Sequence, residues 1–427
     1  MSLRSLLVSR VAEQLTGEAR QNRLRRAAEK KRRAAGAPHT VDYFHQADDP
    51  YSCLVAQVLP QLIARYDIRL RCHLVSAPPN WAAPERERLQ AWSRVDAQKL
   101  ARRAGLAFID ADGQPSRSRL AQAEAALVAS LEGERFADEA GRISLALWSG
   151  ADIPVRDAAV AAAKAEGDAL RSRLGHYLGG TLHYGGEWYW GLDRLHYLEE
   201  RLAELGARRA NAPDAPIYAQ PQTRLPDARP GAGGELHYYL SFRSPYTWIA
   251  AHRAKGLADA YGLALKLRFV LPMVMRGLPV PPAKRTYIML DAAREARRAG
   301  VPFGKICDPV GRPVERGYSL LPWAIGLGKG FDYCAAFMRA VWSQGVDAGS
   351  DAGMRRIVEA AGLDWSLARP LIGNNDWRQE AEANRQELMS LGLWGVPSFR
   401  VNEVSAWGQD RLWVIEDAIR AAQAKEH

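Results

Sequence analysis

Hydrophobic and polar positions along the chain form two blocks that repeat in the same order. Near residue 40 and again near residue 235, a short stretch rich in aromatic residues precedes a Pro-Tyr pair. About fifteen residues with apolar positions at helical spacing come next, and a second short apolar stretch closes each block. Proline suits the first turn of a helix, because the N–H that it lacks would be unpaired there. Each block therefore predicts a β-α-β unit with parallel strands and a right-handed crossover.

The two blocks are similar in sequence as well as in pattern. They align without a gap from Thr40 and from Glu235, and identical pairs include Tyr43 with Tyr238 and Pro50 with Pro245. Farther along, two segments share the pattern Trp-Gly-x-Asp-Arg-Leu, namely Trp188–Leu202 and Ser405–Ile419. Because both pairs occur in the same order, we interpret the chain as a tandem duplication.

The duplication sets the predicted domain boundaries. Each copy has the expected order β-α-β, a long insertion with helical periodicity, and β-β-α, so the fold class is α/β. A chain of 427 residues is also too long for one ordinary core. The predicted parts are a basic helical extension, a first domain, a Pro/Gly-rich linker and a second domain, at residues 1–38, 39–210, 211–234 and 235–427.

Charge and hydropathy narrow the classes of partner. The net charge of +10 is concentrated in Arg20–Arg33, which holds eight basic residues and one acid. We interpret this run as a solvated helix face; contact with nucleic acid or an anionic membrane is the alternative. No zinc-finger, RNP or helix-turn-helix spacing is found, so no nucleic-acid partner is expected. The absence of a long apolar stretch or a secretory signal predicts a cytoplasmic protein without a transmembrane segment.

The cysteines and histidines argue against two kinds of chemistry. The four cysteines, at positions 53, 72, 307 and 334, are too widely spaced for a CxxC dithiol or a zinc half-site. Isolated thiols suit a reducing compartment. The nine histidines lack HExxH or similar spacing, so no metal is expected.

Four motifs occur in order in the second domain: FRSPYTWIA, PPAKRTYIMLDAAREARRAGVPF, LWGVPSFRV and WGQDRL, which begin at Phe242, Pro281, Leu393 and Trp407. Together they resemble the 2-hydroxychromene-2-carboxylate isomerases and kappa-class glutathione transferases, in the DsbA-like branch of the thioredoxin fold. The resemblance covers nearly all of residues 235–427. It implies two tandem DsbA-like thioredoxin folds, each with a helical insertion, and glutathione as the cofactor.

Ser244 is the candidate catalytic residue. It directly precedes Pro245 at the predicted start of a helix, where a hydroxyl and the helix dipole both stabilise negative charge. A thiolate held there has a lowered pKa and a larger reactive fraction. The resemblance implies that this serine contacts the sulfur of glutathione. The alternative is an ordinary helix-capping serine.

Other candidate glutathione contacts follow from the resemblance. Val396-Pro397 matches the place where the thioredoxin fold has a cis-proline, which exposes the backbone of Val396 to an extended peptide; an ordinary trans turn is the alternative. Gln409 and Asp410 match the place that binds the γ-glutamyl end, although a carboxylate there could also cap the helix. Lys284 corresponds to a lysine near the glycyl carboxylate. The family usually carries an asparagine shortly before this lysine, and its absence here puts one contact in doubt.

The expected function is a glutathione-dependent isomerase or transferase acting on a small aromatic or unsaturated substrate. Tyr246, Trp248 and Trp407 are the candidate residues of an apolar substrate pocket. Two alternatives remain open. One is a thiol-disulfide oxidoreductase relative of DsbA, which the missing dithiol disfavours. The other is a non-catalytic thioredoxin-fold binding protein.

The first domain is predicted to be a degenerate copy. Asp49 stands where the second copy has Ser244, and its carboxylate would repel a thiolate. Cys53 lacks a partner cysteine and is interpreted as a buried apolar residue. No proline stands before the first copy's strand pair. A homodimer, or a pseudo-dimer of the two copies within one chain, is the expected assembly.

Overall fold

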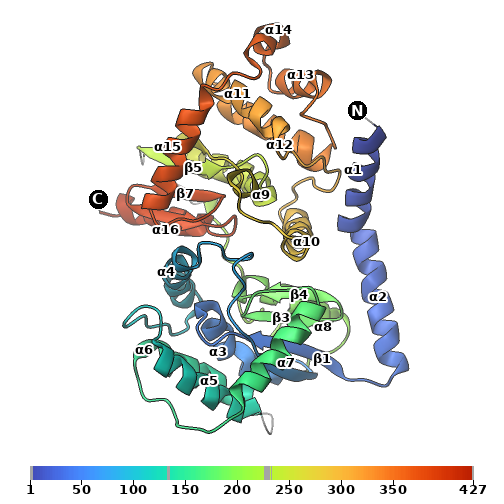
Figure 1. The fold of residues 1–427 in the computed structure, drawn as a ribbon, viewed down its shortest axis with the longest axis vertical. Coiled ribbons are helices and arrows are strands. Elements are labelled where there is room, and N and C mark those ends of the chain that lie inside the picture. The colour runs from blue at the N-terminus through green and yellow to red at the C-terminus, as the bar shows by residue number, and fades with distance from the viewer. Residues whose placement is uncertain (1–2, 132–134, 226–230, 232, 426–427) are drawn as a thin grey trace. The chain divides into compact units, whose positions relative to one another are not determined.

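The computed structural model describes residues 3–131, 135–225, 231 and 233–425 (Figure 1). Residues 226–230 and 232 of the predicted linker lie outside the described residues. The chain forms two compact units. Unit 1 consists of residues 1–21, 221–280 and 288–427, and unit 2 of residues 22–220 and 281–287.

The two units divide the chain differently from the predicted boundaries at two places. The basic extension forms two helices, of which α1 (Leu3–Thr16) belongs to unit 1 and most of α2 (Glu18–Ala34) to unit 2. Residues 281–287, at the start of α10 (Pro282–Arg298), belong to unit 2 although the rest of that helix belongs to unit 1. Both segments are assigned to a unit by their contacts in the folded chain, and sequence similarity gives no information about those contacts.

Unit 2 follows the predicted order of strands and helices. A β-α-β unit comes first, four helices form the insertion, and two strands and a helix close the unit (Figure 1). The elements are β1 (His39–His45), α3 (Pro50–Arg65), β2 (Ile68–Leu74), α4 (Arg86–Ala104), α5 (Arg117–Leu131), α6 (Phe136–Ser149), α7 (Val160–Arg173), β3 (Thr181–Tyr184), β4 (Glu187–Trp190), the 3-10 turn η2 (Leu192–Arg194) and α8 (Leu195–Glu204).

Unit 1 repeats this order with a longer helical insertion. Helices α9 and α16 of this unit contact each other and the strands, so they cover the same face of the sheet. The elements are β5 (Glu235–Leu240), α9 (Pro245–Tyr261), β6 (Ala264–Phe269), η4 (Met273–Arg276), the rest of α10, α11 (Arg312–Gly326), α12 (Gly330–Ser343), α13 (Asp351–Ala360), α14 (Trp365–Ala368), η5 (Arg369–Leu371), α15 (Trp377–Ser390), β7 (Ser398–Val401), β8 (Val404–Trp407) and α16 (Leu412–Gln423).

The two four-stranded sheets have the same strand order and the same register. The orders are β2-β1-β3-β4 and β6-β5-β7-β8, with a parallel first pair and antiparallel pairs after it. Thr40 pairs with Arg69 in unit 2, and Glu235 pairs with Ala264 in unit 1. These are the residues that the ungapped sequence alignment makes equivalent. A tandem duplication requires this agreement; the duplication itself stays a prediction.

Buried hydrogen bonds recur at equivalent positions in the two units. The Tyr43 hydroxyl donates to the Ser52 carbonyl at 3.0 Å, and the Tyr238 hydroxyl donates to the Thr247 carbonyl at 2.6 Å. Each bond ties the first strand of a sheet to the first turn of the helix that follows. Both tyrosines are fully buried, so their rings belong to the cores and their hydroxyls satisfy a backbone group there.

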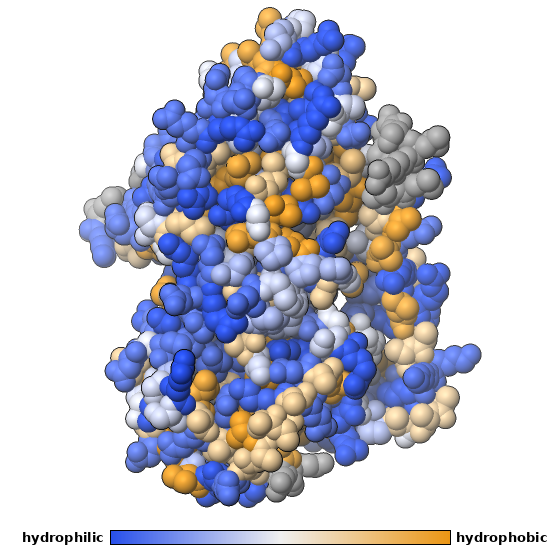
Figure 2. Space-filling view, viewed as in Figure 1, coloured by the Kyte–Doolittle hydropathy of each residue, from blue (hydrophilic) through white to orange (hydrophobic). Residues whose placement is uncertain are grey.

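The outer surface is mostly polar. On the face seen in Figure 2, hydrophilic residues cover most of each unit and hydrophobic residues occur in scattered groups. Among the described residues, no helix combines the length and the apolar character that crossing a bilayer requires.

Candidate functional site

Ser244 caps the N-terminus of α9. Its backbone is extended, with φ −95° and ψ 116°, and its Oγ accepts a hydrogen bond from the Thr247 amide at 3.2 Å. Pro245 occupies the first turn, where no N–H is needed. The serine hydroxyl therefore lies at the mouth of a 17-residue helix, where the helix dipole favours negative charge.

The Gly-Val-Pro loop before β7 lies directly against Ser244. The Ser244 hydroxyl donates to the Val396 carbonyl oxygen at 3.3 Å, and the Val396–Pro397 peptide bond is cis. No described residue accepts a hydrogen bond from the backbone amide of Val396. Two segments 152 residues apart in the chain thus meet at one point. That point has a hydroxyl on one side and an unpaired backbone amide on the other.

This geometry is suited to holding an anion. The hydroxyl of Ser244 has one donor, which it now directs to a neutral carbonyl. A thiolate at the helix mouth would take over this donor, because hydrogen bonds to a charged acceptor are stronger than those between neutral groups. Next to the serine, Arg243 is held in place by Asp308, with Nε and Nη2 each 2.8 Å from a carboxylate oxygen.

Trp407 closes one side of the loop. Its ring meets that of Trp394 edge-on, with centroids 5.7 Å apart. A Cβ added to Gly395 would lie 2.7 Å from the Trp407 ring, closer than such atoms approach. Gly395 is therefore needed for the loop to pass under the indole. The predicted pocket residue Trp407 borders the site and is half-buried.

Gln409 and Asp410 lie on a turn joined to the loop, because the Gly408 amide donates to the Pro397 carbonyl at 3.0 Å. The side chain of Gln409 is buried and donates to Glu295 at 2.6 Å, while Arg253 donates to its backbone and side-chain oxygens. Its side chain is thus engaged inside unit 1. Asp410 lies 3.3 Å from Nη1 of its neighbour Arg411.

Sequence reasoning missed two members of this network. Arg253 and Glu295 lie on α9 and α10 and meet at Gln409. Burial lowers the pKa of the Arg253 guanidinium, and the nearby carboxylates of Asp410 and Glu295 oppose that shift. A single arginine on a helix carries no local signal of such a partner, so only the fold could reveal it.

The aromatic pocket predicted from sequence is wrong for Trp248. Its side chain is 1% exposed and its indole N–H donates to the Pro302 carbonyl at 2.9 Å, so it is a core residue. Tyr246 is half-buried; its hydroxyl donates to Asp291 at 2.8 Å and its ring packs on a small apolar cluster that includes Ile249. Both side chains turn toward the helices of the insertion, because these positions of α9 face the core.

Lys284 belongs to unit 2, where its ammonium donates to the Ala82 carbonyl at 2.9 Å. Burial lowers its pKa to about 8. Its expected contact with a glycyl carboxylate stays a prediction.

The equivalent place in unit 2 is filled. Asp49 caps α3 and accepts from the Ser52 amide and hydroxyl, at 2.8 and 2.7 Å. Gly180 has the position that Pro397 has in unit 1, since the Gly191 amide donates to it as the Gly408 amide donates to Pro397. A Cβ on Gly180 would lie 3.1 Å from the Asp49 carboxylate. The backbone thus closes over the helix mouth and leaves little room for a ligand.

The cysteines take no part in either helix mouth as a pair. All four are free; Cys53 and Cys334 are buried, and Cys72 and Cys307 are half-buried. Burial raises the pKa of Cys307 to about 11. Among the described residues, no group of three or more His, Cys, Asp or Glu side chains is arranged to hold a metal ion.

Comparison with known proteins gives results for the C-terminal half. Residues 235–420 match the DSBA-like thioredoxin domain. A 2-hydroxychromene-2-carboxylate isomerase of Pseudomonas putida is 23% identical over 192 residues, which are 43% of this chain and 93% of that protein. The isomerase of Pseudomonas sp. strain C18 is 23% identical over 195 residues, 44% of this chain and 91% of that protein.

Solved structures resemble the chain over a similar share of its length. A 2-hydroxychromene-2-carboxylate isomerase has a TM-score of 0.39 at 21% identity and covers 45% of this chain and 97% of its own. The cytosolic disulfide reductase DsbM from Pseudomonas aeruginosa has a TM-score of 0.34 at 19% identity and covers 45% of this chain and 98% of its own. The match of residues 235–420 to the DSBA-like domain shows that the C-terminal half has a DsbA-like thioredoxin fold.

Proposed function

We propose that the C-terminal half is a glutathione-dependent isomerase or transferase domain acting on a small aromatic or unsaturated substrate. The observation that carries the proposal is the contact of 3.3 Å between the Ser244 hydroxyl and the Val396 carbonyl. It joins a sulfur-stabilising donor at a helix mouth to a backbone amide available for an extended peptide. The relatives named as isomerases supply the reaction type.

In the isomerisation, the thiolate of glutathione is a borrowed nucleophile. When bound, glutathione would supply reversible addition of a thiolate to a conjugated double bond, which allows rotation about that bond before the thiolate is released. Ser244 lowers the energy of the thiolate at both ends of this cycle by donating its hydrogen bond.

The alternative of a thiol-disulfide oxidoreductase needs a nucleophilic cysteine. Serine stands at the α9 mouth and aspartate at the α3 mouth, and the four cysteines are all unpaired. We therefore favour the glutathione reaction. We further propose that unit 2 is a second DsbA-like fold in which Asp49 and Gly180 have replaced the ligand site.

The test is glutathione binding by the full chain, with Ser244→Ala compared with Ser350→Ala. Ser350 caps α13 in the same way, accepting from the Gly353 amide at 3.1 Å. Both changes remove a cap worth about 0.5–2 kcal/mol, so loss of stability is matched between them. Only Ser244→Ala should raise the pKa of bound glutathione, by about 1–2 units, since a hydrogen bond to a charged group contributes about 1.5–3 kcal/mol.

The readout is the ultraviolet absorbance of bound thiolate as a function of pH, together with retention on immobilised glutathione. Ser244→Thr keeps the hydroxyl and should restore the low pKa. If the parent chain neither binds glutathione nor perturbs its pKa, the proposed function is wrong. Equal effects of Ser244→Ala and Ser350→Ala would assign Ser244 to helix capping alone.

A further inference from the structure

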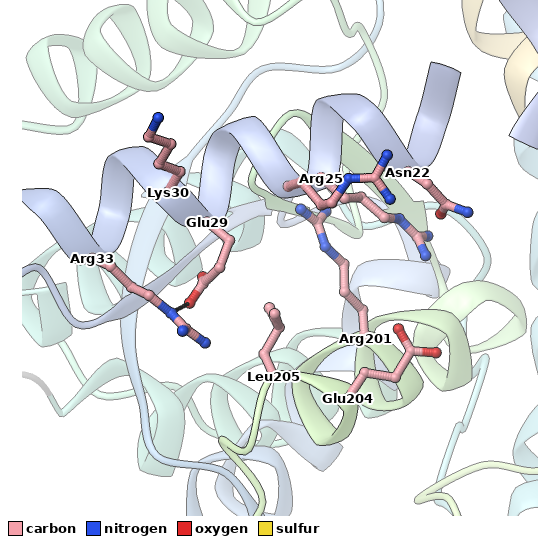
Figure 3. Close-up of a pocket in the computed structure, with 9 residues that line it drawn as sticks. Asn22, Arg25, Glu29, Lys30, Arg33, Arg201, Glu204 and Leu205 are labelled. Atoms are coloured by element: carbon pink, nitrogen blue, oxygen red, sulfur yellow. Dashed lines mark hydrogen bonds and ion pairs between the residues drawn. The ribbon is translucent and has the colours of Figure 1, made fainter. Parts of the chain in front are cut away.

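Helix α2 and the C-terminal end of α8 enclose a hollow of about 560 Å³ within unit 2 (Figure 3). Figure 3 shows the α2 side chains along one wall, with Arg201 and Glu204 from α8 opposite and Leu205 between them. The lining carries five basic and two acidic side chains, an excess of three positive charges; it consists of Asn22, Arg25, Arg26, Glu29, Lys30, Arg33, Arg201, Glu204 and Leu205.

One face of α2 is fixed to the rest of unit 2. Arg25 forms a bidentate pair with Glu187, at 2.6 and 2.9 Å. Glu29 is held by Arg32 at 2.7 and 2.8 Å, and Arg32 also donates to the Ala37 carbonyl. Residues 25, 29 and 32 recur at helical spacing, so they form one stripe. The helix that carries the basic run is therefore anchored here.

The adjacent face of α2 carries cations that the described residues do not neutralise. Arg26 and Lys30 are exposed, and neither makes a hydrogen bond or ion pair with any described residue. The carboxylate of Glu29 does little to neutralise these two cations, because it already pairs with Arg32 and Arg33. The hydrogen bonds from these two arginines lower the pKa of Glu29 to about 2. On the opposite wall, the buried Arg201 donates to the Tyr184 carbonyl at 2.8 Å and lies 3.7 Å from Glu187.

We propose that this hollow binds a compact polyphosphate anion, such as the phosphate chain of a nucleoside triphosphate. Arg26 and Arg33 are about 10 Å apart along the helix axis, so one small monoanion could not meet both while a chain of phosphates could. Guanidinium groups also match phosphate with two parallel hydrogen bonds. The volume lies within the range typical of small-molecule sites.

Features of the walls favour a compact anion over a nucleic-acid strand. No aromatic side chain lines the hollow, so there is no surface on which a base could stack. Glu204 closes the α8 side with a negative charge that would repel a strand running past it. Leu205 supplies an apolar patch between the walls.

The experiment is calorimetric titration of the full chain with inorganic tripolyphosphate. The double variant Arg26→Gln/Lys30→Gln should weaken binding by at least about tenfold, or about 1.4 kcal/mol. The matched control is Arg23→Gln/Lys31→Gln, which removes the same charge from exposed positions of α2 outside the hollow and should leave affinity within about twofold.

A gain of affinity provides a measurement that misfolding cannot imitate. Glu204→Gln removes the repelling carboxylate and should tighten tripolyphosphate binding severalfold. If the two double variants lost the same affinity for tripolyphosphate, the net charge of the chain alone would explain binding. That result would overturn the proposal. So would the absence of binding by the parent, or binding of a single-stranded oligonucleotide without binding of tripolyphosphate.

Discussion

At the scale of the residue, the two units differ in the residue that caps the helix after the first strand. Ser244 and Asp49 occupy equivalent places, and each accepts a hydrogen bond from the amide three residues later. A serine cap keeps one donor available, and here it points at the Val396 carbonyl. An aspartate cap has no donor when ionised, so it cannot stabilise a thiolate. The two helix mouths therefore differ in the cap residue, and also in the residue before the strand pair, which is Pro397 in unit 1 and Gly180 in unit 2.

Asp49 should make stability depend on pH. Burial raises its pKa to about 6, above its ordinary value of about 3.9. The folded state then binds the proton more tightly than the unfolded state, so this contribution is complete below about pH 4 and is lost as pH rises through about 6. Asp49→Asn keeps a capping side chain without the charge. We expect it to be more stable than the parent by about 1–3 kcal/mol at pH 8, and similar at pH 4.

Urea unfolding of the parent and of Asp49→Asn at the two pH values measures this difference. The same gain or loss at both values would contradict the expected titration. Ser350→Ala serves as a control, because it changes a cap in unit 1 without changing a titrating group.

At the scale of the element, the site depends on the path of the Gly-Val-Pro loop, which lies between the ring of Trp407 and the start of β7. β7 begins at Ser398, directly after the loop, and pairs with β5 in the register Tyr238 with Phe399. The rings of these two residues stack with centroids 5.4 Å apart, which fixes the strand. Trp407, at the end of β8, then covers Gly395. The loop position follows from this packing, not from the loop sequence alone.

Gly395→Ala should damage the site and the fold together. The new methyl group would lie 2.7 Å from the Trp407 ring, so the loop or the ring must move. Overpacking of this kind costs about 1–3 kcal/mol, and we expect weaker glutathione retention because Val396 moves with the loop.

Gly256→Ala is the matched control for that change. Gly256 lies within α9, and a Cβ there meets only Leu225 at 3.6 Å, an ordinary contact. Alanine should stabilise the helix by about 0.5–1 kcal/mol. Thermal unfolding of the two variants should therefore shift in opposite directions. A rise in the unfolding temperature of both variants would contradict this prediction, because it would show that the Trp407 ring moves away from the new methyl group at little cost.

At the scale of the whole molecule, both units have the same strand order but differ in their side chains and loops at equivalent places. Unit 1 has the serine cap and the cis-proline loop; unit 2 has a buried acid under a glycine and a basic hollow on its surface. Neither unit carries a cysteine pair, and the four thiols are dispersed between them. The proposed function relies on glutathione, an external thiol, and predicts that all four cysteines of the chain are free.

Thiol titration checks this for the entire chain. In denaturant without reductant, all four cysteines should react, because none is in a disulfide. In the native protein the reaction should be slow, since burial raises the pKa of Cys72 to about 12 and leaves Cys53 and Cys334 inaccessible. Fewer than four thiols in the denatured protein would reveal a disulfide and favour the oxidoreductase alternative.

Local signals in the sequence determined much of this protein. Proline after a capping residue marked the starts of α3 and α9, and period-two and helical patterns located the strands and the first helices. The alignment of the two blocks predicted a β-α-β unit at the start of each, and the structure has a parallel strand pair joined by a helix in both places. Ser244 and Val396 were each predicted to contact glutathione; that role stays a prediction, and in the structure the two residues lie 3.3 Å apart. These features follow from short-range geometry and from a motif whose parts occur in a fixed order.

Only the tertiary structure decided which side chains share a space. Trp248 lies in the core because of the helical insertion packed against α9, and no periodicity distinguishes that core from a ligand pocket. Lys284 donates to the carbonyl of Ala82, 202 residues away in the chain, and Gln409 is held by Arg253 and Glu295. The basic run on α2 became a walled hollow because Arg25 is anchored to Glu187. Each of these partners is far away in the chain, and long-range packing leaves no local pattern in a single sequence.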